Sequence, residues 1–123
     1  ASLRRTIVKS RTPMTSSGTK VLSAFTGSNG YTYLVKVDLV MQHSTTTESY
    51  VATYTSHYSM NSGTMNLIGS LNSATSSNGL GFVTVSTALT ASGGVVVLNG
   101  IVGGVFSGGT YNFGTFMSIQ EVG

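Results

Sequence analysis

The side chains able to do acid–base chemistry are few in this chain of 123 residues. They are Asp38, Glu48, Glu121, His43 and His57. General acid–base catalysis needs such groups held within hydrogen-bonding reach of one substrate. The sequence predicts one close pair, because a hairpin centred on Thr45-Thr46 would set His43 opposite Glu48. We interpret this pair as a surface contact at a solvent-facing hairpin tip, since exposed ion pairs contribute little.

The residues that other catalytic or metal sites require are missing from the sequence. The chain has no cysteine, and His43 with His57 alone would leave a four-coordinate zinc site incomplete. Only a threefold axis, which would triple each histidine, offers the missing ligands. The G-x-S-x-G nucleophile motif does not occur, and no glycine-rich run precedes a predicted helix that could receive a phosphate. The sequence therefore predicts no enzyme activity, no metal and no cofactor.

Positive charge is confined to the start of the chain. Five of the six lysines and arginines lie in the first 20 residues: Arg4, Arg5, Lys9, Arg11 and Lys20. From residue 21 onward one lysine stands against three acids, so the net +3 is the sum of +5 and −2. A nucleic-acid-binding domain normally carries a basic face over its fold, with aromatic side chains placed to stack on bases. We therefore expect no nucleic acid as partner and assign the five cations to a partner-binding segment.

The composition predicts one folded all-β domain. Charged residues make up 7% of the chain, yet 40% of it is hydrophobic, more than a disordered chain carries. Helix is disfavoured because glycine, threonine and valine are frequent. The longest apolar run, residues 94–106, is shorter than the roughly 20 residues needed to cross a bilayer, so no membrane partner is expected.

Alternating and turn-bounded segments predict about eight strands. The clearest are 31–43 and 48–60, which alternate as half-buried strands do and should pair as a long hairpin, with His57 near Leu34. The other strands are expected at 21–25, 65–70, 81–89, 95–98, 101–106 and 113–122. Residues 72–79 and 107–110 are expected to be loops, and Asn99-Gly100 a hairpin turn. This spacing predicts a single antiparallel β-sandwich or jelly roll over residues 21–123.

Residues 1–20 are predicted to form an extended basic N-terminal arm outside that domain. Pro13 removes a donor from any strand ladder, and the Ser/Thr/Gly stretch after it has little to bury. The alternative is a disordered chain end.

Aromatic side chains are the strongest packing signal. Tyr50, Tyr54 and Tyr58 share one face of a predicted strand, and Phe113 and Phe116 lie in the last strand. Aromatic rows of this kind fill either a core or an interface between subunits, and we predict these five as subunit-interface residues. The alternative is a carbohydrate-binding platform, which the lack of tryptophan disfavours.

Four segments carry a resemblance to a known group of proteins. They are the two long strands, the Gly/Ser/Thr-rich middle and the last strand: YTYLVKVDLVMQH, ESYVATYTSHYSM, GLGFVTVSTALTASGGVVVLNGIVGG and FMSIQEVG. From Tyr31 to Gly123 the chain thereby resembles the small β domains of bacteriophage virions, at tail-fibre tips and among capsid decoration proteins. The resemblance implies a jelly-roll or C1q/TNF-like sandwich that assembles as a homotrimer.

The resemblance implies a structural virion protein with one of two roles. In the first, a trimeric capsid decoration (cement) protein stabilises the capsid exterior, and its basic arm docks on the major capsid protein. In the second, the receptor-binding tip of a tail fibre binds a host surface glycan through its loops. We favour decoration, because the chain begins at Ala1 and looks like a complete short protein.

Overall fold

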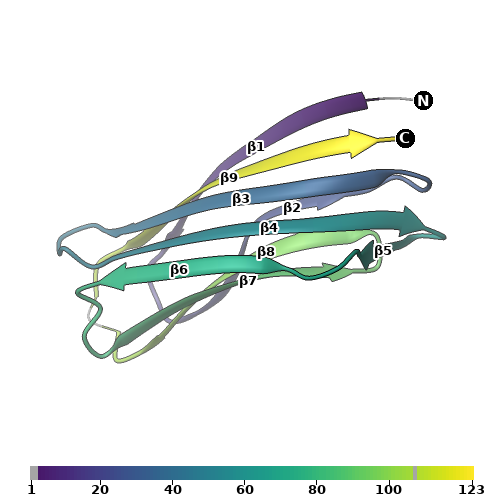
Figure 1. The fold of residues 1–123 in the computed structure, drawn as a ribbon. Coiled ribbons are helices and arrows are strands. Elements are labelled where there is room, and N and C mark those ends of the chain that lie inside the picture. The colour runs from purple at the N-terminus through teal and green to yellow at the C-terminus, as the bar shows by residue number, and fades with distance from the viewer. Residues whose placement is uncertain (1–2, 107) are drawn as a thin grey trace.

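The described residues form nine β-strands and no helix (Figure 1). The computed structural model describes residues 3–106 and 108–123; residues 1, 2 and 107, which belong to the predicted arm and a predicted loop, lie outside them. The strands are β1 (Leu3–Met14), β2 (Gly18–Thr26), β3 (Thr32–His43), β4 (Ser49–Asn61), β5 (Thr64–Leu67), β6 (Asn72–Asn78), β7 (Val83–Ser92), β8 (Val95–Gly104) and β9 (Tyr111–Val122). The predicted all-β class is confirmed. The described residues contain no helix that is long and apolar enough to span a membrane.

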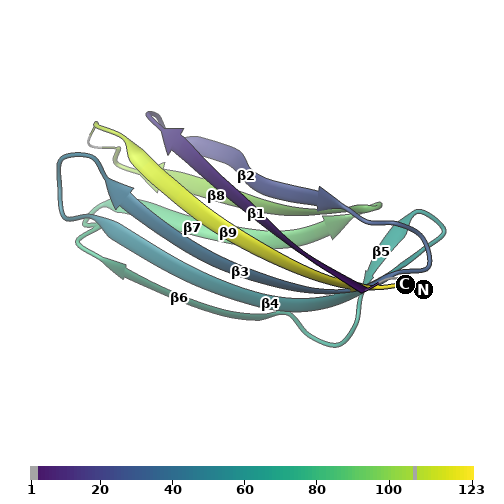
Figure 2. The ribbon, with the colours of Figure 1, turned by 90° about the horizontal axis from the view of Figure 1, so that it is seen from above.

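The strands form two antiparallel sheets stacked as a sandwich (Figure 2). The large sheet has the order β1-β9-β3-β4, and the second edge of β4 is shared by β5 and β6. The small sheet has the order β2-β8-β7 and covers one face of the large sheet. The predicted antiparallel sandwich is confirmed at this level, whereas the jelly-roll or C1q/TNF-like class stays a prediction.

The long hairpin of β3 and β4 has the predicted centre. Gln42 pairs with Ser49, so the turn is centred on Thr45-Thr46, and Leu34 pairs with His57 as expected. Alternate side chains of both strands point inward and are buried, while most of those between them are exposed. The period of two in the sequence therefore marks the inner face of the large sheet.

Residues 3–20 belong to the sandwich and do not form a separate arm. Every residue of β1 pairs with β9, from Leu3 opposite Val122 to Met14 opposite Tyr111. The predicted boundary at residue 20 falls inside β2, which pairs with β8. Pro13 fits because β1 is the edge strand of its sheet, a place where proline is tolerated. The sequence of β1 hides its alternation, because apolar Leu3 and Ile7 lie at outward positions while polar Thr6, Ser10 and Thr12 lie at inward ones.

Two further local predictions were wrong. The expected turn at Asn99-Gly100 lies inside β8, where Gly100 pairs with Lys20 of β2 on one side and Thr87 of β7 on the other. Glycine serves close packing there, because a Cβ would lie 2.9 Å from a methyl group of Leu22. The expected loop at 72–79 is largely β6, a strand of exposed side chains that is held by backbone pairing with β4.

The core fills the space between the two sheets. It consists of the inward side chains of the large sheet and the side chains of the small sheet that face them, and its largest fully buried members include Tyr111, Phe113, Met14, Leu39 and Met41. The outer face of the large sheet has no described element packed over it. A ligand or partner that approaches from this side therefore meets the outward side chains of β1, β9, β3 and β4.

Candidate functional site

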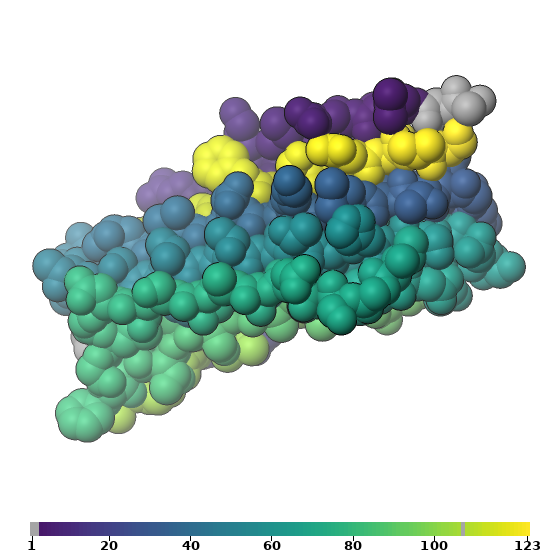
Figure 3. Space-filling model, in the orientation of Figure 1, coloured from purple at the N-terminus to yellow at the C-terminus, as the bar shows by residue number. Residues whose placement is uncertain are grey.

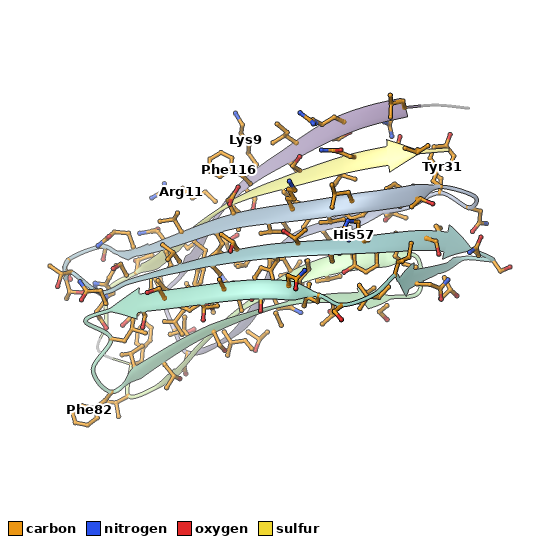
Figure 4. All side chains as sticks on the ribbon, viewed as in Figure 1. Lys9, Arg11, Tyr31, His57, Phe82 and Phe116 are labelled. Carbon is orange, nitrogen blue, oxygen red and sulfur yellow. The ribbon has the colours of Figure 1, made fainter. Side chains whose placement is uncertain are left out.

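Four of the five aromatic residues predicted at a subunit interface lie in the core. Tyr50, Tyr54 and Tyr58 project from β4, and Phe113 projects from β9, into the space between the sheets, where all four are buried. The small sheet covers the face that the sequence pattern left open to a partner subunit. Phe116 differs, because it projects from β9 to the outer face and keeps 49% of its surface exposed (Figure 4).

The buried tyrosines connect the two sheets through their hydroxyl groups. Tyr50 Oη and Tyr54 Oη both contact Thr87 Oγ1 of β7, the first at 2.9 Å. Burial raises the pKa of the Tyr54 hydroxyl above its usual value of 10.0, and the hydrogen bond with Thr87 opposes that rise in part. These hydroxyls satisfy one another inside the sandwich, so this part of the predicted site serves the fold.

Two of the five N-terminal cations also serve the domain itself. Arg4 Nε lies 2.7 Å from Oε1 of the buried Glu121 at the start of the β1–β9 pairing. Lys20 Nζ donates a hydrogen bond to the Pro13 carbonyl at 3.1 Å and so links β2 to the end of β1. Neither charge belongs to the outer face of the large sheet.

The other three cations share that outer face. Arg5, Lys9 and Arg11 occupy alternate outward positions of β1, and all are exposed. Lys36 adds a fourth positive charge from β3. The even spacing of the three β1 cations is a signal in the sequence that indicates one strand face, although their neighbours on β9 depend on a pairing across the whole chain.

A groove of about 400 Å³ lies on this face between β1 and β9. The register sets Lys9 opposite Phe116 and Arg11 opposite Gly114, and these four residues line the groove together with Asn112. In Figure 3, β1 in purple and β9 in yellow lie side by side along this surface. Figure 4 shows the side chains of Lys9, Arg11 and Phe116 gathered there.

Glycine at position 114 keeps the groove open. An added Cβ would meet its nearest atom, the Val40 carbonyl oxygen, only at 3.8 Å, and apart from its chain neighbours no side chain lies within 4 Å of that position. Arg11 Nη2 donates to Asn112 Oδ1 at 3.4 Å, which directs the guanidinium along the groove. Asn112 and Gly114 carry no signal in the sequence, because their role follows only from the β1–β9 register.

His43 and Glu48 lie opposite each other across the turn, as predicted. Both side chains are buried, so the prediction that they form a solvent-facing contact was wrong. His43 N donates to the Glu48 carbonyl at 3.0 Å, and His43 Nε2 lies 3.8 Å from Glu48 Oε2. The segment leading into β9 covers the pair: His43 Nε2 is 2.7 Å from the Gly108 carbonyl, and a Cβ on Gly109 would lie 2.5 Å from His43 Cε1.

Hydrogen bonds give this buried pair a structural role. The backbone N–H groups of Thr45 and Thr46 both donate to His43 Nδ1 at 3.2 Å, so the ring hydrogen lies on Nε2 and is donated to the Gly108 carbonyl. Glu48 accepts hydrogen bonds from the hydroxyls of Thr46 at 2.8 Å and Tyr111 at 2.9 Å. These bonds close the hairpin, and none of these side chains lines the groove.

The two histidines lie on opposite faces of the large sheet. His43 points into the sandwich, while His57 points outward from β4, so one chain cannot bring both to the same ion. Residues 3–106 and 108–123 hold no group of three His, Asp or Glu side chains suited to a metal.

The sequence matches no family model and no curated protein. Among solved structures, the fold is similar to that of the Acinetobacter baumannii phage AM24 tailspike protein, with a TM-score of 0.45 and 11% sequence identity. The match covers 95% of this chain and 26% of the tailspike chain, so this chain spans about a quarter of the length of that protein.

Proposed function

We propose that this chain is a non-catalytic binding domain on the surface of a bacteriophage particle, and that it attaches the particle to a host surface glycan. The observation that carries the proposal is the half-exposed Phe116 ring, set in an open groove opposite Lys9 of β1. An aromatic face binds the apolar face of a sugar ring, while flanking polar groups bind its substituents. The groove offers both on one rigid sheet.

The distribution of acids supports binding without cleavage. Glycoside hydrolysis normally uses two carboxyl groups about 5–10 Å apart on either side of the bond. Asp38 projects from the outer face of β3 opposite Phe116, whereas Glu48 and Glu121 are buried on the inner side. The described part of the outer face therefore holds one carboxylate where a hydrolase would need two.

Capsid decoration is the second candidate function, supported by the exposed side chains of β1. Arg5 adds charge to the edge strand, and the exposed Leu3 and Ile7 add apolar surface. An acidic lattice formed by a major capsid protein would be attracted to this strand. The mechanism would differ from the one expected from the sequence, because residues 3–14 are paired along their whole length with β9 and would dock as a sheet edge rather than spread as an arm.

Assembly as a homotrimer is part of the proposal under either role. Four of the five aromatic residues first assigned to the interface are buried and Phe116 lines the groove, so the contact would use exposed apolar side chains away from the groove, such as Leu67 and Ile68 at the β5 edge. Light scattering on the intact chain tests this directly, and a monomer mass at working concentration contradicts it.

Binding to host cells and binding to purified capsids separate the two candidate functions. We expect the intact domain to bind host cells, Phe116→Ala to lower that binding about tenfold, and Lys20→Gln to leave it unchanged. Lys20→Gln is the matched control because it removes one charge away from the outer face. If the domain binds purified capsids and does not bind host cells, capsid decoration replaces the proposed function.

A further inference from the structure

We infer that the groove beside Phe116 binds a sugar residue that carries a carboxylate, with the sugar ring on the phenyl face and the carboxylate between Lys9 and Arg11. The inference rests on the proposed function, since it names the chemical class of glycan that the same groove would take. It follows from the strand register, from the empty position at Gly114 and from the charges around the ring.

The register places all the required groups within the span of one monosaccharide. Phe116 and Lys9 are cross-strand partners, as are Gly114 and Arg11, and such partners have Cβ positions about 5 Å apart. The two pairs are successive outward pairs, separated along the strand by about 7 Å. A ring lying over Gly114 and against Phe116 would therefore have one cation beside it at each end.

Gly114 determines the shape of the site. Any side chain at this outward position would occupy the space between Arg11 and Val40, which glycine leaves open. The floor of the groove is the backbone of β9 around this residue. A sugar ring can consequently approach the sheet closely, beside the Phe116 ring and not only against its tip.

The charges around the ring give the ligand a direction. Lys9 and Arg11 line the β1 side of the groove, and Asp38 lies opposite Phe116 on the β3 side. An anionic substituent is attracted to the first side and repelled by the second. Arg11 donates a hydrogen bond to Asn112 at the end of the groove away from Phe116, and the remaining N–H donors of its guanidinium, arranged as a fork, suit a carboxylate.

The test uses the intact chain and three soluble probes in calorimetric titrations. The probes are oligosaccharides of glucuronic acid, the same oligosaccharides after reduction of each carboxylate to an alcohol, and glucose 6-phosphate. We expect the uronate to bind at least tenfold more tightly than its neutral counterpart, and added salt to weaken it, because a hydrogen bond between charged groups is worth about a tenfold change in affinity. Equal affinity for the acidic and neutral sugars, no uronate binding, or tighter binding of the sugar phosphate would each overturn the inference.

Four variants locate the site. Arg11→Gln should weaken uronate binding about tenfold and leave neutral-sugar binding unchanged, whereas Phe116→Ala should weaken both. Gly114→Leu keeps every charge and fills the groove, so it should abolish binding, and Lys20→Gln should have no effect. Unchanged uronate binding in Gly114→Leu would overturn the inference, provided that its circular dichroism spectrum and unfolding midpoint match those of the parent chain; Gly114→Ala, a smaller block, replaces it if they do not.

The same variants distinguish a failure of this inference from a failure of the proposed function. If Gly114→Leu still binds host cells as the parent chain does, the groove is not the sugar-binding site, while the adhesion role stands. If the parent chain binds the uronate, Gly114→Leu does not, and the parent chain does not bind host cells, then the groove is a sugar-binding site but the adhesion role is refuted.

Discussion

Phe113 and Phe116 stand three residues apart on β9 and belong to two different environments. Phe113 points into the sandwich and has 0% of its surface exposed, whereas Phe116 points outward with 49% exposed. The same contrast holds for the carboxylates Glu48 and Asp38. The strand period of two assigns alternate residues of one segment to stability and to binding, so identical side chains should respond to mutation in opposite ways.

The phenylalanines give the largest expected effect. Phe113→Ala should lower the free energy of unfolding by about 3–5 kcal/mol, because it opens a cavity in a core that cannot close over it. Phe116→Ala should change it by less than about 1 kcal/mol, since the ring is already half in water. Urea denaturation of both variants measures the difference, and equal losses would mean that the two faces of β9 are not inner and outer.

The carboxylates come next. Glu48→Ala removes the acceptor of hydroxyl hydrogen bonds from Tyr111 and Thr46, and we expect a loss of about 2–3 kcal/mol, as for other buried polar groups that lose a partner. Asp38→Ala, on the exposed face, should stay within about 0.5 kcal/mol of the parent. Thermal unfolding followed by circular dichroism compares the two, and a larger loss from Asp38→Ala would contradict the assignment of the faces.

Substituting alanine for one glycine on each face tests the effect of adding a methyl group. A Cβ on Gly100 would lie 2.9–3.1 Å from three carbon atoms of Leu22, so Gly100→Ala should cost about 1–2 kcal/mol through overpacking. Gly114→Ala meets nothing closer than 3.8 Å and should be neutral or slightly stabilising, because alanine loses less backbone entropy than glycine. Its effect should appear in sugar affinity instead. A stability loss at Gly114 equal to that at Gly100 would show that the groove is not open.

The sequence predicts those parts of the fold where each strand carries its own alternation. The β3–β4 hairpin, its centre at Thr45-Thr46 and the all-β sandwich follow from that pattern alone. Strand β6 does not, because all its side chains are exposed and its order comes from pairing with β4. The dipeptide Asn99-Gly100 is a common turn signal, but packing against Leu22 takes precedence over it.

The candidate site is harder to predict from sequence than the fold. The cations of β1 and the exposed Phe116 are visible as residues, but their meeting depends on an antiparallel pairing between the two ends of the chain, from Leu3 to Val122. No local pattern encodes that register. The same limit explains why Tyr50, Tyr54 and Tyr58 were assigned to a subunit interface: a row of aromatic residues does not show whether its own chain or another copy covers it.

The smallest expected effect concerns the Tyr54 hydroxyl on the inner face, and it depends on pH. Burial raises the pKa of Tyr54 in the folded protein above its usual 10.0. Below that pH the group is protonated in both states and adds no pH dependence. As the pH rises past 10, the unfolded chain loses a proton that the folded chain keeps, so the free energy of unfolding falls by up to about 1.4 kcal/mol per pH unit until the raised pKa is reached.

Tyr54→Phe lacks this proton but also lacks the hydrogen bond to Thr87, and near neutral pH it should be less stable by about 1 kcal/mol. The deficit should shrink in urea denaturation curves between pH 8 and pH 11, because only the parent chain carries the Tyr54 proton whose pKa burial raises. A deficit that stays constant over this range would mean that water reaches the Tyr54 hydroxyl, and that the inner face is less closed at that point than its buried neighbours indicate.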